Sequence, residues 1–292
     1  MMNKNYNDIL STIKKEFPYI YDNFEMLCNV NSIFVEKIKN IELIENDYNL
    51  CITYEETLEY TKNILKEINI NYYKEFENIV KNNVISLDVE NKYNDSRVTS
   101  NGKIIMKLNN NYSDISTLIH EYTHYHHLMN SKNKSPFNRQ FLGEMFSITF
   151  EIYSIDELLK GGISKKNINF NKRIIFEKQI SEFYNDNLKN ILDYYRTNKN
   201  ILTCYVEDDD NILFARRISS HLIHLIGFIF SNYIVKNIDM EKVIEVNDNI
   251  NEYENIDNIF YNLNIDFKSN QFITECIDDV IEHYCSNKKI II

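Results

Sequence analysis

The chain has 292 residues, of which 43% are apolar and 13% aromatic, and a chain of this size and composition buries a core of its own. Its 43 acidic and 32 basic residues give a net charge of −11, which repels nucleic-acid phosphates and anionic lipids, so we expect neither kind of partner. Five glycines and two prolines are too few for a Rossmann or P-loop domain or a β-sandwich, and they predict a mainly α fold.

The cysteines and the apolar runs indicate the compartment. The five cysteines are odd in number, widely spaced and without a CxxC pair, which is typical of free thiols in a reducing compartment. The first residues lack an apolar run of signal-peptide length, and no stretch approaches 18 consecutive apolar residues. We therefore expect a cytoplasmic protein that neither spans nor binds a membrane.

Apolar residues at helical spacing predict two helices at the start of the chain. The first covers about 5–17 and stops at Pro18, and the second covers about 19–44. A third helix begins at Thr53, since Thr53 and Glu56 have the spacing of a capping box. Its apolar face is formed by Leu58, Leu65, Ile68 and Tyr72. We group the region 1–82 as N-terminal helices.

The middle of the chain changes character. Within 84–108, a Ser-Asn-Gly turn ending at Gly102 precedes a short predicted strand over 103–108. Ser113 or Asp114 then caps a helix that runs to about Met129. After a loop with Pro136, a helix is expected over 138–160, closed by Gly161 and Gly162.

Amphipathic patterns predict three more helices in the rest of the chain, over 171–196, 209–236 and 270–286. No repeat, linker or step in composition marks a boundary. The sequence therefore predicts a single catalytic domain over 1–292, with N-terminal helices, a core at about 84–162 and a C-terminal helical lobe at about 163–292. Two lobes that meet at a cleft are compatible with this pattern.

Four of the seven histidines lie within residues 120–127, in the sequence HEYTHYHH. On a helix, His120 and His124 project from one face and can bind a single metal ion. Glu121 lies between them, where it can reach a metal-bound water. This HExxH arrangement is that of zinc peptidases, in which Zn²⁺ takes a third protein ligand and leaves one position for water. The alternative is a polar helix face with solvated histidines, which the apolar flanking residues disfavour.

The third zinc ligand is expected on the following helix. Glu144 and Glu151 are seven residues apart and therefore share a helix face. Their apolar neighbours argue against a pair of solvated surface glutamates. We predict that Glu144 binds the metal and that Glu151 orients a histidine ligand; the reverse assignment is the alternative.

A family resemblance rests on these same residues. The stretches 102–109 and 114–127, with Glu144, Ser147 and Glu151, resemble the strand, HExxH helix and "ExxSxxxE" helix of the M3 peptidases, the relatives of oligoendopeptidase F and thimet oligopeptidase. The resemblance covers about 100–160. It implies a gluzincin-type helical metallopeptidase core with one Zn²⁺ per chain and a peptide substrate, and it matches His127 to the trailing histidine of the family motif, beside the ligands.

The resemblance also suggests how substrate is held. The strand with Ile104, Ile105 and Met106 would form a cleft edge that pairs with the extended substrate backbone. The alternative is a β edge of a small structural sheet beside the HExxH helix. Three departures from the family pattern stand out: Thr123 replaces a glycine, only 20 residues separate His124 from Glu144, and the chain has about half the usual length.

A late helix matches the family region that supplies donors to the attacked carbonyl. There, His221 and His224 are one turn apart, and Tyr233 follows. Any of them can stabilise an oxyanion, although His221 and His224 can equally be core histidines. Together these features predict a zinc endopeptidase or oligopeptidase with Glu121 as general base. The alternatives are a non-catalytic zinc-binding pseudo-peptidase and an exported proteolytic toxin.

Overall fold

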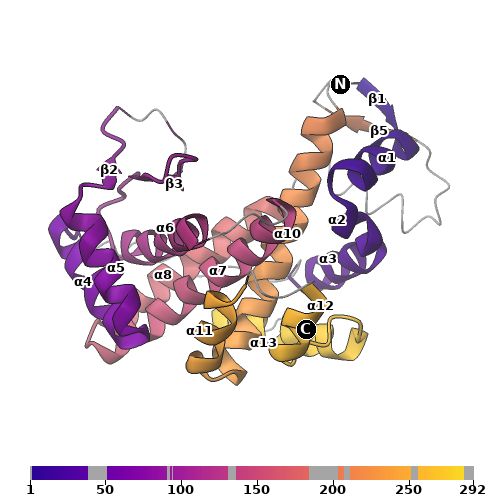
Figure 1. Ribbon diagram of the computed structural model, residues 1–292. Helices are drawn as coiled ribbons and strands as arrows, with labels where there is room; N and C mark the ends of the chain where they lie inside the picture. Colours follow the sequence, from indigo (N-terminus) through magenta and orange to yellow (C-terminus); the bar gives the residue numbers. More distant parts are fainter. Residues whose placement is uncertain are drawn as a thin grey trace. The chain divides into compact units, whose positions relative to one another are not determined.

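The computed structural model describes residues 2–38, 51–90, 93, 95–130, 136–183, 203–206, 211–250 and 256–285 (Figure 1). The described chain is mainly helical with a few short strands, as the composition predicts. It divides into two compact units, one formed by 1–43, 176–229 and 266–292, the other by 44–175 and 230–265. Among the described residues, no helix is both long and apolar enough to cross a membrane.

The first unit combines helices with a two-stranded sheet. Strands β1 and β5 pair antiparallel, with Met2 opposite Val206. One predicted helix over 19–44 is two helices here, since a break at Asn23 separates them, and 39–44 lie outside the described residues. The elements of this unit are β1 (Met2–Asn5), α1 (Tyr6–Glu16), α2 (Pro18–Asp22), α3 (Phe24–Ile38), the end of α8 (Lys165–Phe183), β5 (Thr203–Val206), the first part of α10 (Asn211–Asn237) and α13 (Asn270–Cys285).

The second unit contains both motif helices. Its elements are α4 (Tyr54–Ile68), α5 (Ile70–Lys81), β2 (Ile85–Leu87), β3 (Arg97–Val98), β4 (Ile104–Met106), α6 (Ser113–Asn130), α7 (Pro136–Lys160), the first part of α8 (Lys165–Phe183), the end of α10, α11 (Met240–Asp248) and α12 (Ile256–Asn262). Helix α8 begins six residues before its predicted start, and α11 and α12 were not predicted.

The predicted helix from Thr53 starts as expected but ends early. Thr53 and Glu56 form both hydrogen bonds of a capping box, at 3.1 and 2.7 Å. Asn69 then adopts an extended conformation and its side chain accepts from the backbone N–H of Asn71, so it caps a new helix, α5. The chain thus forms a helical hairpin where one continuous apolar face was expected.

The sheet of the second unit corrects one prediction. Strand β4 lies between β2, which pairs with it in parallel, and β3, which pairs antiparallel. The expected strand exists, but it is the centre of the sheet and not an edge, because both neighbours use its backbone groups. A substrate therefore cannot add to β4 as a further strand.

The loop between β4 and α6 is held by Asp114. Its buried carboxylate accepts hydrogen bonds from the backbone N–H groups of Asn109 and Asn111, at 2.9 and 3.3 Å. Asn111 in turn accepts from the backbone N–H of Ser113 at 2.8 Å. The predicted capping role of Ser113 or Asp114 therefore falls to Asn111, and Asp114 instead ties the loop to the helix.

Helices α6 and α7 lie side by side in the second unit (Figure 1). The buried side chains of Leu118 and Ile119 on α6, and Phe146 and Phe150 on α7, form the core around them. Helix α7 starts at Pro136, a residue suited to the first turn, and ends at Gly161 and Gly162, the latter with φ +88°. This packing fixes the faces that carry the histidines and the glutamates.

Candidate metal centre

His120 and His124 project from one face of α6, as the i,i+4 spacing predicts. Their Nε2 atoms are 3.0 Å apart, a separation at which both can point to one ion. His120 is buried, with 7% of its surface exposed, while His124 is partly exposed. The pair therefore presents two nitrogen ligands at the boundary between core and solvent.

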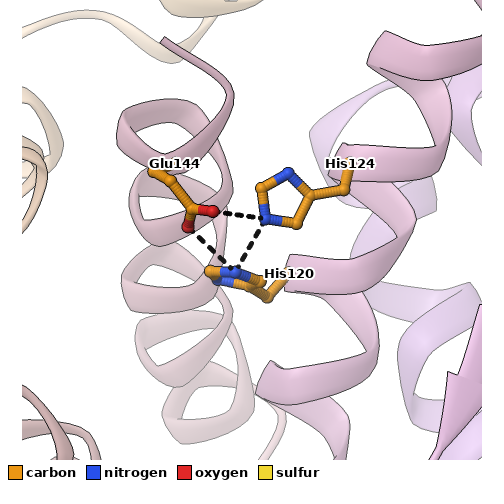
Figure 2. Close-up of side chains that lie close together, drawn as sticks. All are labelled: His120, His124 and Glu144. Carbon is orange, nitrogen blue, oxygen red and sulfur yellow. Dashed lines mark hydrogen bonds and ion pairs between the residues drawn. The ribbon is translucent and has the colours of Figure 1, made fainter. Parts of the chain in front are cut away.

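Glu144 on α7 completes a group of three ligands (Figure 2). Its Oε2 lies 3.5 Å from His120 Nε2 and its Oε1 lies 3.4 Å from His124 Nε2. Atoms bound to one tetrahedral zinc at about 2.0–2.2 Å stand about 3.3–3.6 Å apart. Both carboxylate–imidazole distances lie in this range, and the 3.0 Å between the two imidazole nitrogens is somewhat shorter. The two histidines and the carboxylate therefore fit Zn²⁺ in donor type and come close to its spacing.

Glu151 lies two turns further along α7 and contacts the other side of the His120 ring. Its Oε2 is 3.1 Å from His120 Nδ1, and only 3% of its surface is exposed. Burial opposes the charged imidazole, but hydrogen bonds with Glu144 and Glu151 outweigh it and raise the pKa of His120 to about 10. Glu144 faces the Nε2 atoms and Glu151 faces Nδ1. Their roles as ligand and orienting residue stay predictions.

Glu121 follows His120 on α6 and is also buried, at 7% exposure. One residue along a helix turns the side chain by about 100°, so Glu121 shares the helix turn of the histidines without sharing their direction. It does not belong to the three-ligand group. This position suits a group that acts beside a metal and does not bind it.

His127 is buried in the second unit, at 8% exposure. Its Nε2 is 2.6 Å from Oδ1 of Asn247 on α11, and burial lowers its pKa to about 3, so the ring is neutral. Its Nδ1 has no hydrogen-bond partner among the described residues. His127 thus contacts α11, and its expected role beside the ligands stays a prediction.

The predicted substrate-binding residues lie on β4, and the predicted oxyanion-stabilising residues lie on α10. Ile104 and Met106 are fully buried and Ile105 is partly exposed. The Tyr233 hydroxyl is 3.4 Å from the Asn264 carbonyl oxygen. His224 lies on the part of α10 that belongs to the first unit and is half-buried, and the side chain of His221 lies outside the described residues. These roles stay predictions.

A second polar cluster, which sequence reasoning does not predict, joins α6 to α5 and α11. His126 Nδ1 is 2.6 Å from Glu75 Oε2 on α5, and His126 Nε2 is 3.4 Å from Asp248 Oδ1 on α11. Burial lowers the pKa of His126, but hydrogen bonds with both carboxylates outweigh it and raise it to about 9. Tyr122 also donates to Glu75, at 2.7 Å. These partners come from distant segments, and no local motif marks them.

No protein-family model and no curated protein matches the sequence. Three solved structures match the fold with TM-scores of 0.57, 0.55 and 0.55: a Bacillus anthracis protein described as an oligoendopeptidase F, PZ peptidase A with an inhibitor, and a Chlamydophila abortus protein described as a peptidase. Identities are 12%, 10% and 15%, and the matches cover 97%, 96% and 96% of this chain but 57%, 58% and 55% of those chains. The chain thus shares its fold with these proteins and spans less than three fifths of their length.

Proposed function

We propose that the protein is a zinc-dependent endopeptidase or oligopeptidase, a short relative of the M3 peptidases. The observation that carries this proposal is the convergence of His120, His124 and Glu144 on one point, with ligand atoms 3.0–3.5 Å apart. The fold shared with oligoendopeptidase F and related peptidases supports the same reaction class. Free cysteines favour its action in a reducing compartment such as the cytoplasm.

In the proposed reaction, different residues of the chain bind the metal, orient a histidine and transfer a proton. His120, His124 and Glu144 hold the zinc, which when bound activates water and polarises the scissile carbonyl as a Lewis acid. Glu151 fixes the ring of His120 through Nδ1. Glu121 accepts the proton of the attacking water and returns it to the leaving amine, so that one carboxylate serves both steps.

The remaining predicted roles are part of the proposal. His221, His224 or Tyr233 donates a hydrogen bond to the developing oxyanion. The partly exposed Ile105 is the residue of the 104–106 strand that can contact substrate through its side chain, since Ile104 and Met106 are buried. The whole chain acts as one catalytic domain with one Zn²⁺.

The test separates metal binding from catalysis. Glu121→Gln keeps the size of the side chain and removes its basicity, so we expect zinc binding to be retained while peptide hydrolysis falls by about 10²–10⁴-fold. His120→Ala removes a ligand and should lose both. Zinc content is measured by elemental analysis, and hydrolysis with quenched fluorescent peptide libraries, with and without chelator. A Glu121→Gln variant that cleaves as fast as the parent would overturn the mechanism.

A further inference from the structure

The two histidine ligands differ in how their second nitrogens are satisfied. An imidazole that binds metal through Nε2 carries a hydrogen on Nδ1, and that N–H needs an acceptor to fix the ring. His120 has Glu151 at 3.1 Å. For His124, no described residue makes a hydrogen bond to Nδ1, and this nitrogen points away from the ligand group in Figure 2.

The hydrogen-bond chain behind His127 determines which of its nitrogens can accept. The Tyr72 hydroxyl donates to the Asp248 carboxylate at 2.5 Å, so it accepts from Asn247 Nδ2 at 2.8 Å. The Oδ1 of Asn247 must then face His127, and an amide oxygen only accepts. His127 Nε2 is therefore the donor, at 2.6 Å, and Nδ1 of this neutral ring carries a lone pair.

This lone pair is an acceptor without a partner. Nδ1 of His127 is buried, and it makes no hydrogen bond with the described residues. Buried acceptors in native proteins are nearly always paired, directly or through ordered water. Its environment therefore points to a donor that lies close by.

Gly143 lies beside both of these nitrogens. A Cβ built on Gly143 would lie 3.6 Å from His124 Nδ1 and 3.7 Å from His127 Nδ1. These two nitrogens, neither of which has a hydrogen-bond partner among the described residues, thus border the same small space beside Gly143, the residue before Glu144. A residue with a side chain would fill that space.

We propose that His127 is the positioning residue of His124, and that its Nδ1 accepts the hydrogen of His124 Nδ1 across one water in the space beside Gly143. His127 does for His124 what Glu151 does for His120, but with a neutral acceptor that is held by α11 through Asn247. This inference rests on zinc binding at the proposed site. The competing interpretation is that His127 only ties α6 to α11.

Two substitutions at one position separate the interpretations. The amide of His127→Gln reaches the place of Nε2, so it keeps the bond to Asn247 and loses the Nδ1 acceptor. The amide of His127→Asn reaches the place of Nδ1, so it keeps an acceptor there and loses the bond to Asn247. Zinc affinity is measured by competition with a chromophoric chelator, the ligand field by Co²⁺ absorption, and stability by thermal unfolding of the metal-free protein.

We expect His127→Gln to weaken zinc binding by about 10- to 100-fold and to change the Co²⁺ spectrum, with little change in metal-free unfolding temperature. His127→Asn should bind zinc within about threefold of the parent and unfold at a lower temperature. Parental zinc affinity in His127→Gln, or equal losses in both variants, would overturn the inference. A parent that binds zinc but cleaves no peptide would overturn only the proposed function, and one that binds no zinc would overturn both.

Discussion

At the scale of single residues, the four histidines of α6 show how environment assigns different roles to one side chain. His120 faces Glu144 and Glu151, and His124 faces the same ligand group through Nε2. His126 lies between two carboxylates and is charged, while the buried His127 is neutral. Eight consecutive positions thus supply two candidate ligands, an ion-pairing cation and a neutral hydrogen-bonding group.

Glu151 offers a test of how far a residue outside the ligand group controls metal affinity. Glu151→Gln keeps an oxygen that accepts from His120 Nδ1 but removes the negative charge that raises the basicity of the ring. We expect zinc affinity to fall by about tenfold in Glu151→Gln and by about 100-fold in Glu151→Ala. Competition with a chelator measures both. If both variants bind zinc like the parent, Glu151 does not orient His120.

The residue-level site was predictable to the extent that helix periodicity determines it. The i,i+4 spacing of His120 and His124 brings the two rings together, and the seven-residue spacing on α7 places both Glu144 and Glu151 beside them. Glu75 and Asp248 were not predictable, because tertiary packing alone brings α5 and α11 to His126.

At the scale of elements, α6 has two polar faces with different partners. One face carries the ligand group toward α7, and the other joins α5 and α11 through His126. Although burial opposes ionisation, hydrogen bonds with His126 lower the pKa of Glu75 and of Asp248. The charged triad of His126, Glu75 and Asp248 therefore holds three helices together.

The stability from this triad should depend on pH. The folded pKa of His126, about 9, is above the unfolded value of 6.5, so its contribution is complete below pH 6.5 and is lost as pH rises toward 9. The carboxylates have lowered folded pKa values, so their contribution is present above their ordinary values of 4.5 and 3.8 and is lost at lower pH. The triad is strongest between about pH 5 and 6.5.

The measurement compares the parent with His126→Gln, which lacks the charge. Thermal unfolding of both metal-free proteins should differ most near pH 6, and the difference should shrink by at least half at pH 9.5. Because His120 titrates in both proteins, its effect cancels in the comparison. A difference that is constant over this range would mean that His126 is not charged in the folded protein.

Element boundaries were less predictable than element types. Apolar periodicity continues across Asn23 and Asn69, so the sequence indicates unbroken helices where the structure has α2 with α3, and α4 with α5. At Asn69, a side-chain cap outweighs the continuous apolar face. Strands β2 and β3 are only three and two residues long, too short for an alternating pattern that would predict a neighbour on each side of β4.

At the scale of the whole molecule, the candidate ligands all belong to the second compact unit. A metal that binds only the folded state stabilises it by about 2.7 kcal/mol at a concentration 100 times Kd. We expect zinc to raise the unfolding temperature of the second unit by roughly 5 °C and to leave the first unit unchanged.

Differential scanning calorimetry with and without zinc measures this shift, and His120→Ala, which lacks a ligand, is the control that should show none. An equal shift in His120→Ala would place the bound zinc elsewhere.

The helical class itself followed from composition, since few glycines and prolines leave few places to turn. The division into two units did not, because each is assembled from separated stretches of chain.

The connection from the sheet to α6 has a mechanical consequence. Asp114 binds the backbone of Asn109 and Asn111, and the last strand residue, Met106, is only a few positions earlier. These hydrogen bonds would have to break before the loop could bend. We therefore expect β4 and the first turn of α6 to move as one body.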